Sequence, residues 1–279
     1  MNEIKINPDI LSWAINQYNL DISIIIKRIG INEEKLEKWL HGDSYPSYKQ
    51  IEKLAKIIHI PLGYFFLNNL PDTQPPIPDL RTVQNRISLS RDFYDVLYDA
   101  LKKSDWLREY RQKNDYEPIR FIGKFSINDN INYIDIVNNI IKEFNLKEDF
   151  FNTISYTQDY LNFWVQKAEE NYIVVLKNGV VGNNTTRKLR VNEFRGFAIA
   201  DKYAPVIFIN SNDSQSAQIF TLVHELAHLW IGQSGIFDML EPNVKNNNKI
   251  EIFCNRISAE LLMPYKYINQ FWNSELLPP

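Results

Sequence analysis

The C-terminal part of the chain is organised around one predicted helix, which contains the stretch Thr221-Leu222-Val223-His224-Glu225-Leu226-Ala227-His228-Leu229-Trp230. His224 and His228 are four residues apart in a strongly helical segment, so both imidazoles project from one face, about one turn apart. This HExxH spacing lets both rings bind one zinc ion, while Glu225 can act on a water molecule rather than on the metal. The apolar neighbours bury the helix and keep the site dry.

A catalytic zinc site needs a third protein ligand and leaves a fourth position for water. The best candidates are Glu251 and Glu260, which lie in the next predicted helix, 249–263. Asp238 and Glu241 are weaker candidates. Asn255, one turn after Glu251, is expected to hydrogen-bond a ligand and so to orient it.

The rest of the C-terminal region alternates predicted helices with short β-type runs, which indicates an α+β domain with a small antiparallel sheet. Asn178-Gly179 is a hairpin signal that should turn strand 172–176 towards 180–181. Segments 197–200 and 206–210 form a second expected pair. Helices are predicted at 92–111, 131–144, 156–168 and 214–232. The aromatic residues of the first of these are spaced as core residues: Phe93, Tyr94, Tyr98, Trp106 and Tyr110.

The N-terminal region reads as a cluster of short helices followed by a proline-rich segment. Helices are expected from Pro8, from Asp21, and over 32–40, 47–59 and 62–67. Four prolines between Pro71 and Pro78 prevent a helix and stiffen the chain. We therefore predict an all-α domain over 1–70, a linker over 71–81 and a second domain over 82–279.

Composition excludes several classes of protein. The 279 residues are 44% hydrophobic and 23% charged, as in an ordinary globular protein, and the net charge of -3 excludes a polycationic nucleic-acid binder. No run approaches the ~20 apolar residues of a membrane span. The N-terminus does not resemble a signal peptide, and the single cysteine, Cys254, requires no oxidising compartment. We expect a cytoplasmic protein without membrane contact; its oligomeric state is not indicated.

The zinc helix and the helix after it resemble a known family. His224-Glu225-Leu226-Ala227-His228, Glu251-Ile252-Phe253-Cys254-Asn255-Arg256 and Ala259-Glu260-Leu261-Leu262-Met263-Pro264 are similar to motifs of the ImmA/IrrE zinc metallopeptidases. The resemblance covers about 195–264. It implies a zincin-like domain with Glu251 as the third ligand, Asn255 behind the ligands and Glu225 as the catalytic base. Segment 197–200 or 206–210 is then either a strand that holds extended substrate or a plain core hairpin.

Residues 8–60 resemble the XRE-type helix-turn-helix of phage repressors, with 32–40 as the recognition helix. Residues 1–70 contain eight Lys/Arg and eight Asp/Glu, and Glu33 and Glu34 would repel phosphates at the expected groove. A helical domain used for protein contacts or dimerisation is the alternative to DNA binding. Contacts to double-stranded DNA would come from a small basic patch: Lys27, Arg28, Lys35 and Lys38.

Together these features predict a regulatory zinc metalloendopeptidase that cleaves a specific protein, which the family resemblance implies is a repressor or an antitoxin. The alternative is a non-catalytic DNA-binding regulator or antitoxin-like protein with a structural zinc site. Glu225 favours the enzyme, because a structural site needs no general base.

Overall fold

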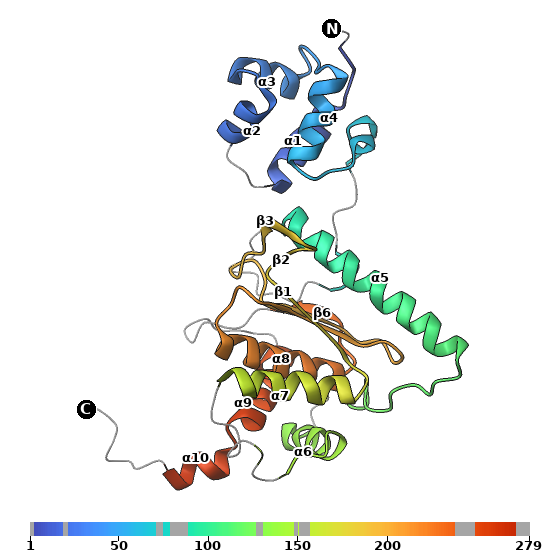
Figure 1. The fold of residues 1–279 in the computed structure, drawn as a ribbon, viewed down its shortest axis with the longest axis vertical. Helices are drawn as coiled ribbons and strands as arrows, with labels where there is room; N and C mark the ends of the chain where they lie inside the picture. Colours follow the sequence, from blue (N-terminus) through green and yellow to red (C-terminus); the bar gives the residue numbers. More distant parts are fainter. Residues whose placement is uncertain are drawn as a thin grey trace, which may run out of the picture. The chain divides into compact units, whose positions relative to one another are not determined.

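The computed structural model describes residues 3–18, 22–70, 75–78, 89–126, 131–147, 150, 157–237 and 249–271. The chain divides into two compact units, one made of Met1–Pro75 with Ser88–Asp95, the other of Pro76–Ile87 with Val96–Pro279. The first contains helices and, among its described residues, no strand of the sheets, and the second combines helices with a small sheet (Figure 1). The predicted α+β class is therefore confirmed. Among the described residues, no helix has the length and apolar character that crossing a membrane requires.

The first unit is a bundle of short helices around a buried core that includes Leu11, Leu36 and Trp39. Its elements are α1 (Pro8–Tyr18), α2 (Ile22–Ile29), α3 (Glu33–His41), α4 (Tyr48–Ile57) and the 3₁₀ helix η1 (Leu62–Phe66). The side chain of Asn32 caps α3 by accepting a hydrogen bond from the Lys35 N–H at 3.0 Å. Gly42, with φ of 78°, ends the same helix in the left-handed conformation that glycine adopts without strain.

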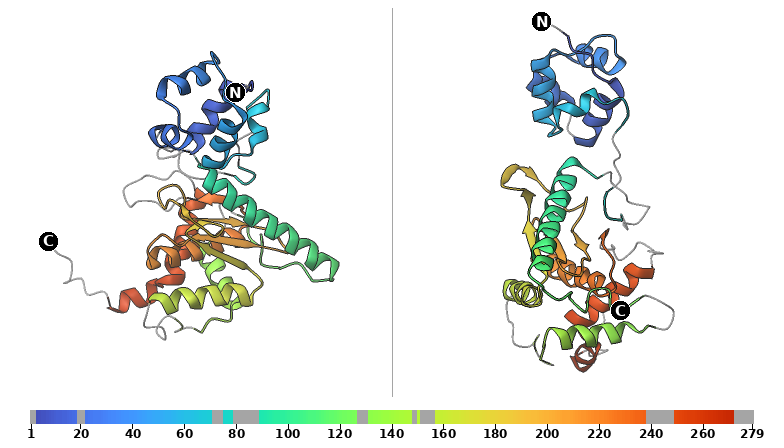
Figure 2. Two further views of the ribbon diagram at one scale, coloured as in Figure 1. Left: turned by 45° about the horizontal axis from the view of Figure 1, so that its top comes forward. Right: turned by 90° about the vertical axis from the view of Figure 1, so that its right-hand side faces the viewer.

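The second unit packs helices against both sides of its sheet. In Figures 1 and 2, α5 lies along one side, while α7 and α8 lie along the other. The helices are α5 (Arg91–Lys113), α6 (Tyr133–Glu143), α7 (Thr157–Glu170), α8 (Gln215–Trp230), α9 (Lys249–Leu262) and α10 (Tyr265–Phe271). The first turn of α5 belongs to the first unit.

The main sheet has the strand order β1-β5-β4-β6 and is mixed rather than antiparallel. Its strands are β1 (Val174–Asn178), β5 (Val206–Asn210), β4 (Gly196–Ile199) and β6 (Gly235–Phe237). The expected pairing of β4 with β5 is confirmed and antiparallel. β1 pairs with β5 in the parallel direction, so the prediction of an antiparallel sheet is wrong at this pair. All five residues of β5 are buried, as expected for the central strand between two neighbours.

The hairpin predicted at Asn178-Gly179 does not form. β2 (Val180–Val181) pairs with β3 (Asn184–Lys188) in a separate two-stranded sheet. A type I′ turn needs positive φ at both central residues, and neither Asn178 nor Gly179 has it. Instead, the Asn178 side chain accepts from the Val180 N–H and donates to the Gly182 carbonyl, which turns the chain away from β1.

The prediction that the aromatic residues of α5 are core residues is correct for Phe93 and wrong for three others. Tyr98, Trp106 and Tyr110 have exposed fractions of 48%, 66% and 47%. The buried stripe of α5 instead includes Ala100 and the polar Ser104.

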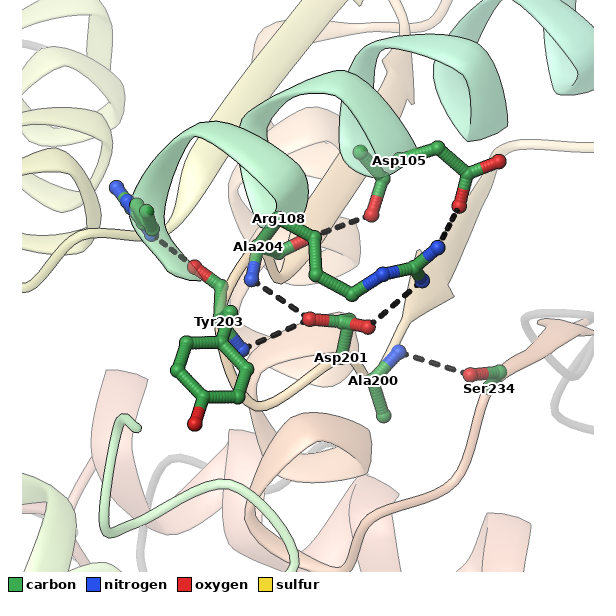
Figure 3. Close-up of polar contacts among 9 residues, drawn as sticks. Asp105, Arg108, Ala200, Asp201, Tyr203, Ala204 and Ser234 are labelled. Atoms are coloured by element: carbon green, nitrogen blue, oxygen red, sulfur yellow. Dashed lines mark hydrogen bonds and ion pairs between the residues drawn. The ribbon is translucent and has the colours of Figure 1, made fainter. Parts of the chain in front are cut away.

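Polar contacts join the C-terminal half of α5 to the loop between β4 and β5 (Figure 3). The Ser104 hydroxyl donates to the Ala204 carbonyl at 2.7 Å, and Arg108 pairs with Asp201 at 3.1 Å. The second oxygen of Asp201 accepts from the backbone N–H groups of Tyr203 and Ala204, both at 2.8 Å. Arg111 also donates to the Tyr203 carbonyl. The rotation of α5 about its own axis is therefore fixed.

Candidate metal centre

Helix α8 carries the HExxH residues through the middle of the second unit. It packs against β4 and β5 of the sheet and against the helices α7 and α9. Ser214 caps its start by accepting from the Ala217 N–H at 3.3 Å. Every residue from Thr221 to Trp230 is buried, so the polar side chains of His224, Glu225 and His228 lie among apolar ones. Such burial is costly unless these groups share a partner.

Helix α9 brings Glu251 to the two histidines. The Nε2 atoms of His224 and His228 are 3.0 Å apart. Glu251 Oε2 lies 3.2 Å from His224 Nε2, and Glu251 Oε1 lies 3.4 Å from His228 Nε2. One ligand atom from each residue falls within 4.8 Å of the others, and all three side chains are buried. Among the described residues, this is the one group of three or more potential ligands so arranged.

The rival ligand Glu260 lies elsewhere. Its carboxylate accepts from the Tyr265 N–H at 3.3 Å and 3.4 Å and so caps the start of α10. The two weaker candidates, Asp238 and Glu241, lie outside the described residues.

The chemistry of this cluster fits a divalent cation. Neither carboxylate oxygen of Glu251 has a hydrogen bond within the described part of the chain, and the same holds for Glu225 Oε2. Buried carboxylates without donors are strongly unfavourable, and a cation between Glu251 and the imidazoles would remove that cost. Two histidines and one glutamate are also a known ligand set of catalytic zinc.

Glu225 lies where β4 approaches α8. A Cβ atom added to Gly196, the first residue of β4, would be 3.3 Å from Glu225 Oε1. Burial, and secondly the neighbouring Glu251 carboxylate, raise the pKa of Glu225 well above its ordinary value. A raised pKa makes the carboxylate a stronger base, which suits a group that accepts a proton and then returns it.

Burial favours the neutral forms of His228 and Cys254. Burial, and secondly His224, lower the pKa of His228 well below its ordinary value, which favours the neutral imidazole that binds metals. Cys254 Sγ lies 3.6 Å from His228 Nδ1. Burial, with Glu251 and Glu225 as further causes, raises the pKa of Cys254, so its thiol stays protonated.

Cys254 therefore lies against Nδ1 of His228, a candidate ligand. From the sequence we expected Asn255 to make such a contact. The Oδ1 atom of Asn255 is buried without a hydrogen-bond partner in the described structure, and its contact with a ligand stays a prediction. Cys254 could have been found from its spacing, because it follows Glu251 by three residues and shares its helix face.

Comparison with known proteins finds a family model that matches part of the second unit. Residues 168–276 match the family model described as Peptidase_M78, IrrE N-terminal-like domain. This segment is therefore similar to the IrrE N-terminal-like domain. It includes α8 and α9 and hence His224, Glu225, His228 and Glu251. The resemblance to ImmA/IrrE peptidases is confirmed for this part of the chain.

A phage protein is also similar to part of the chain. "Uncharacterized immunity region protein 2" of Bacillus phage phi105 is 33% identical over 85 residues, which are 30% of this chain and 54% of that protein. The chain thus spans about half the length of this relative. No solved structure matches the chain.

The predicted DNA contacts lie at the surface of the helical bundle. Lys27 and Arg28 are in the last turn of α2. On α3, Lys38 pairs with Glu34 at 2.7 Å, and Lys35 Nζ lies 5.8 Å from the centre of the Trp39 ring. Because an acidic partner offsets the charge of Lys38, the basic patch is weaker than the bare sequence indicates. DNA binding by these residues stays a prediction.

Proposed function

We propose that this protein is a zinc-dependent endopeptidase that cleaves a specific partner protein of the repressor or antitoxin type. The observation that carries the proposal is the buried convergence of His224, His228 and Glu251, with Glu225 beside them. The IrrE N-terminal-like domain supports a peptidase, and the match to a phage immunity-region protein supports a regulatory substrate.

In this proposal, His224, His228 and Glu251 would hold the zinc ion. Zinc in such a site supplies Lewis acidity: it lowers the pKa of water and polarises a carbonyl group. Glu225 accepts the proton of the attacking water and then gives it to the leaving amine. Its Oε2 atom suits this role, because no hydrogen bond within the described structure occupies it. The apolar surround of α8 excludes bulk water, which strengthens each of these interactions.

Metal analysis of the purified chain tests the ligand set. We expect about one zinc per wild-type chain and its loss in His224→Ala and Glu251→Ala. Glu260→Ala is the matched control, because it removes a glutamate of the same helix that lies away from the histidines, and it should keep its zinc. Loss of zinc from Glu260→Ala with retention in Glu251→Ala would contradict the proposed ligands.

The Glu225→Gln variant distinguishes the enzyme from the alternative, a regulator with a structural zinc site. It keeps the shape of the side chain but removes the base. We expect unchanged zinc content and loss of cleavage of the partner protein, which would be sought among repressors or antitoxins encoded beside this chain. Cleavage that persists in this variant would refute the role of Glu225. DNA binding is a separate prediction, tested by whether Lys35→Ala weakens the binding of duplex DNA.

A further inference from the structure

An exposed stripe runs along the outer face of α5, opposite its buried residues. Five outward residues follow one another at spacings of three and four, which place them on one side of a helix. They are Asp99, Lys102, Trp106, Glu109 and Lys113, and all are exposed. We call these five residues the α5 stripe.

Trp106, at the middle of the stripe, is the most exposed tryptophan or tyrosine of α5 at 66%. Its ring stacks on that of Tyr110, with centroids 5.7 Å apart and planes inclined by 14°. Tyr116 continues the aromatic surface, 6.4 Å from Tyr110. Exposed tryptophan and tyrosine rings gathered on one surface are typical of the centre of a protein interface.

This surface cannot bury itself by a rotation of the helix. The opposite side of α5 is fixed by Ser104, Arg108 and Arg111, which bond to the loop that contains Asp201, Tyr203 and Ala204 (Figure 3). The stripe is therefore presented in one orientation. A preorganised surface of this kind binds a partner at a lower entropic cost than a mobile one.

The charges of the stripe are arranged to match a second copy of the same helix. Reading along α5, the signs are negative at Asp99, positive at Lys102, negative at Glu109 and positive at Lys113, with Trp106 between the two halves. An antiparallel copy centred on Trp106 places Asp99 opposite Lys113, because each is seven residues from the centre. It also brings Lys102, four residues before the centre, to within one residue of the position opposite Glu109, which is three residues after the centre. A parallel copy would place like charges together.

We propose that the chain forms a twofold symmetric dimer in which the α5 stripes of two copies pack antiparallel, with Trp106 against Trp106 at the axis. A twofold interface requires a surface that is complementary to itself, and the sign order of the stripe meets that requirement. Asp99 and Lys113 also pair within their own helix, with Lys103 and Glu109, but such exposed pairs contribute little and leave the charges available.

The oligomeric state of the full chain across a dilution series, measured by analytical ultracentrifugation, tests the proposal. Wild type should be a dimer that dissociates on dilution. Lys102→Glu and Glu109→Lys should each weaken the dimer at least about tenfold, because symmetry applies each reversal twice. Lys56→Glu, at an exposed lysine on α4, is the control and should behave as wild type.

The decisive measurement mixes the two reversals. Lys102→Glu and Glu109→Lys chains, each monomeric alone, should form a heterodimer when combined, because the new carboxylate of one chain then faces the new ammonium group of the other. Trp106→Ala should abolish association while leaving the circular dichroism spectrum unchanged. A monomeric wild type, or a mixture that fails to associate although each reversal alone is monomeric, would overturn the antiparallel arrangement.

Discussion

Gly196 offers the sharpest test of how the sheet is packed on α8. A Cβ at this position would lie 2.5 Å from Thr221 Cγ2 and 2.8 Å from the Phe208 carbonyl oxygen. The Thr221 methyl is buried and has little room to move, and the carbonyl belongs to β5, whose residues pair with β4 in register. Alanine therefore forces β4 away from β5 or α8. Overpacking of this kind costs about 1–3 kcal/mol, which is a fall of about 2–12 °C in melting temperature for a domain of this size.

Thermal and urea unfolding of Gly196→Ala, followed by circular dichroism, would measure this cost. Gly63→Ala is the control, since a Cβ there meets no atom within 4 Å and the φ angle is not positive. It should change stability by less than about 0.5 kcal/mol. Adding Thr221→Ser, which removes the nearest methyl, should recover part of the loss. A Gly196→Ala chain as stable as wild type would show that β4 and α8 are not packed as described.

Two further predictions concern the metal centre. In the metal-free chain, the raised pKa of Glu225 favours its protonated form in the fold, so stability is lost as pH rises above the ordinary value of 4.5. Glu225→Gln should therefore gain stability over wild type with rising pH, by at most about 1.4 kcal/mol per pH unit, in urea unfolding with chelator present; a difference independent of pH would contradict the burial of that carboxyl. Cys254→Ala should lower zinc affinity about 10–100-fold in competition with a chelator, because it removes the group behind His228 Nδ1. Ser258→Ala, one turn further along α9, should leave affinity unchanged, and equal affinity in both variants would refute the role of Cys254.

The features predictable from the sequence are those that depend on local geometry. The i, i+4 spacing of His224 and His228 fixes their shared helix face whatever surrounds them. The apolar pattern likewise marks α8 and α9, whose bounds agree with the predicted helices to within two residues. Glu251 is a harder case, because it lies 23 residues beyond His228, and spacing alone left Glu260 open. The family resemblance favoured Glu251, and the structure brings it to the histidines.

The failed predictions are those where contacts distant in sequence override a local signal. Asn178-Gly179 has the composition of a hairpin turn. A Cβ at Gly179 would, however, lie 2.3 Å from Asn212 Oδ1, so this glycine serves a close approach rather than a turn. The Asn212 side chain donates to the carbonyls of Gly179 and Leu189, which ties this segment to the end of β5. No sequence pattern within residues 172–181 indicates that Asn212 contacts this segment.

The aromatic residues of α5 are a second case in which the local sequence does not determine the packing. Helical periodicity identifies a stripe but does not say which stripe faces the core, and aromatic residues are the usual guide to that choice. Here Ser104, Arg108 and Arg111 make the contacts to the β4–β5 loop, so the polar groups face inward and Trp106 faces outward. In this half of the helix, polar side chains contact the neighbouring loop while Trp106 and Tyr110 are exposed. This contradicts the local rule, and such contradictions are expected at functional surfaces.

The candidate metal centre depends both on local helical spacing and on a contact between residues distant in sequence. Three residues of one helical turn and a glutamate from the next helix meet in an apolar interior, where Glu225 and Glu251 both raise the electrostatic cost of folding without a cation. A site selected only for stability would not keep Glu225, because apolar side chains already surround it and a second buried carboxylate adds cost without adding a ligand. That cost falls on Glu225, the residue to which the proposed mechanism gives the role of base. The electrostatics of the centre therefore favour catalysis over a purely structural metal.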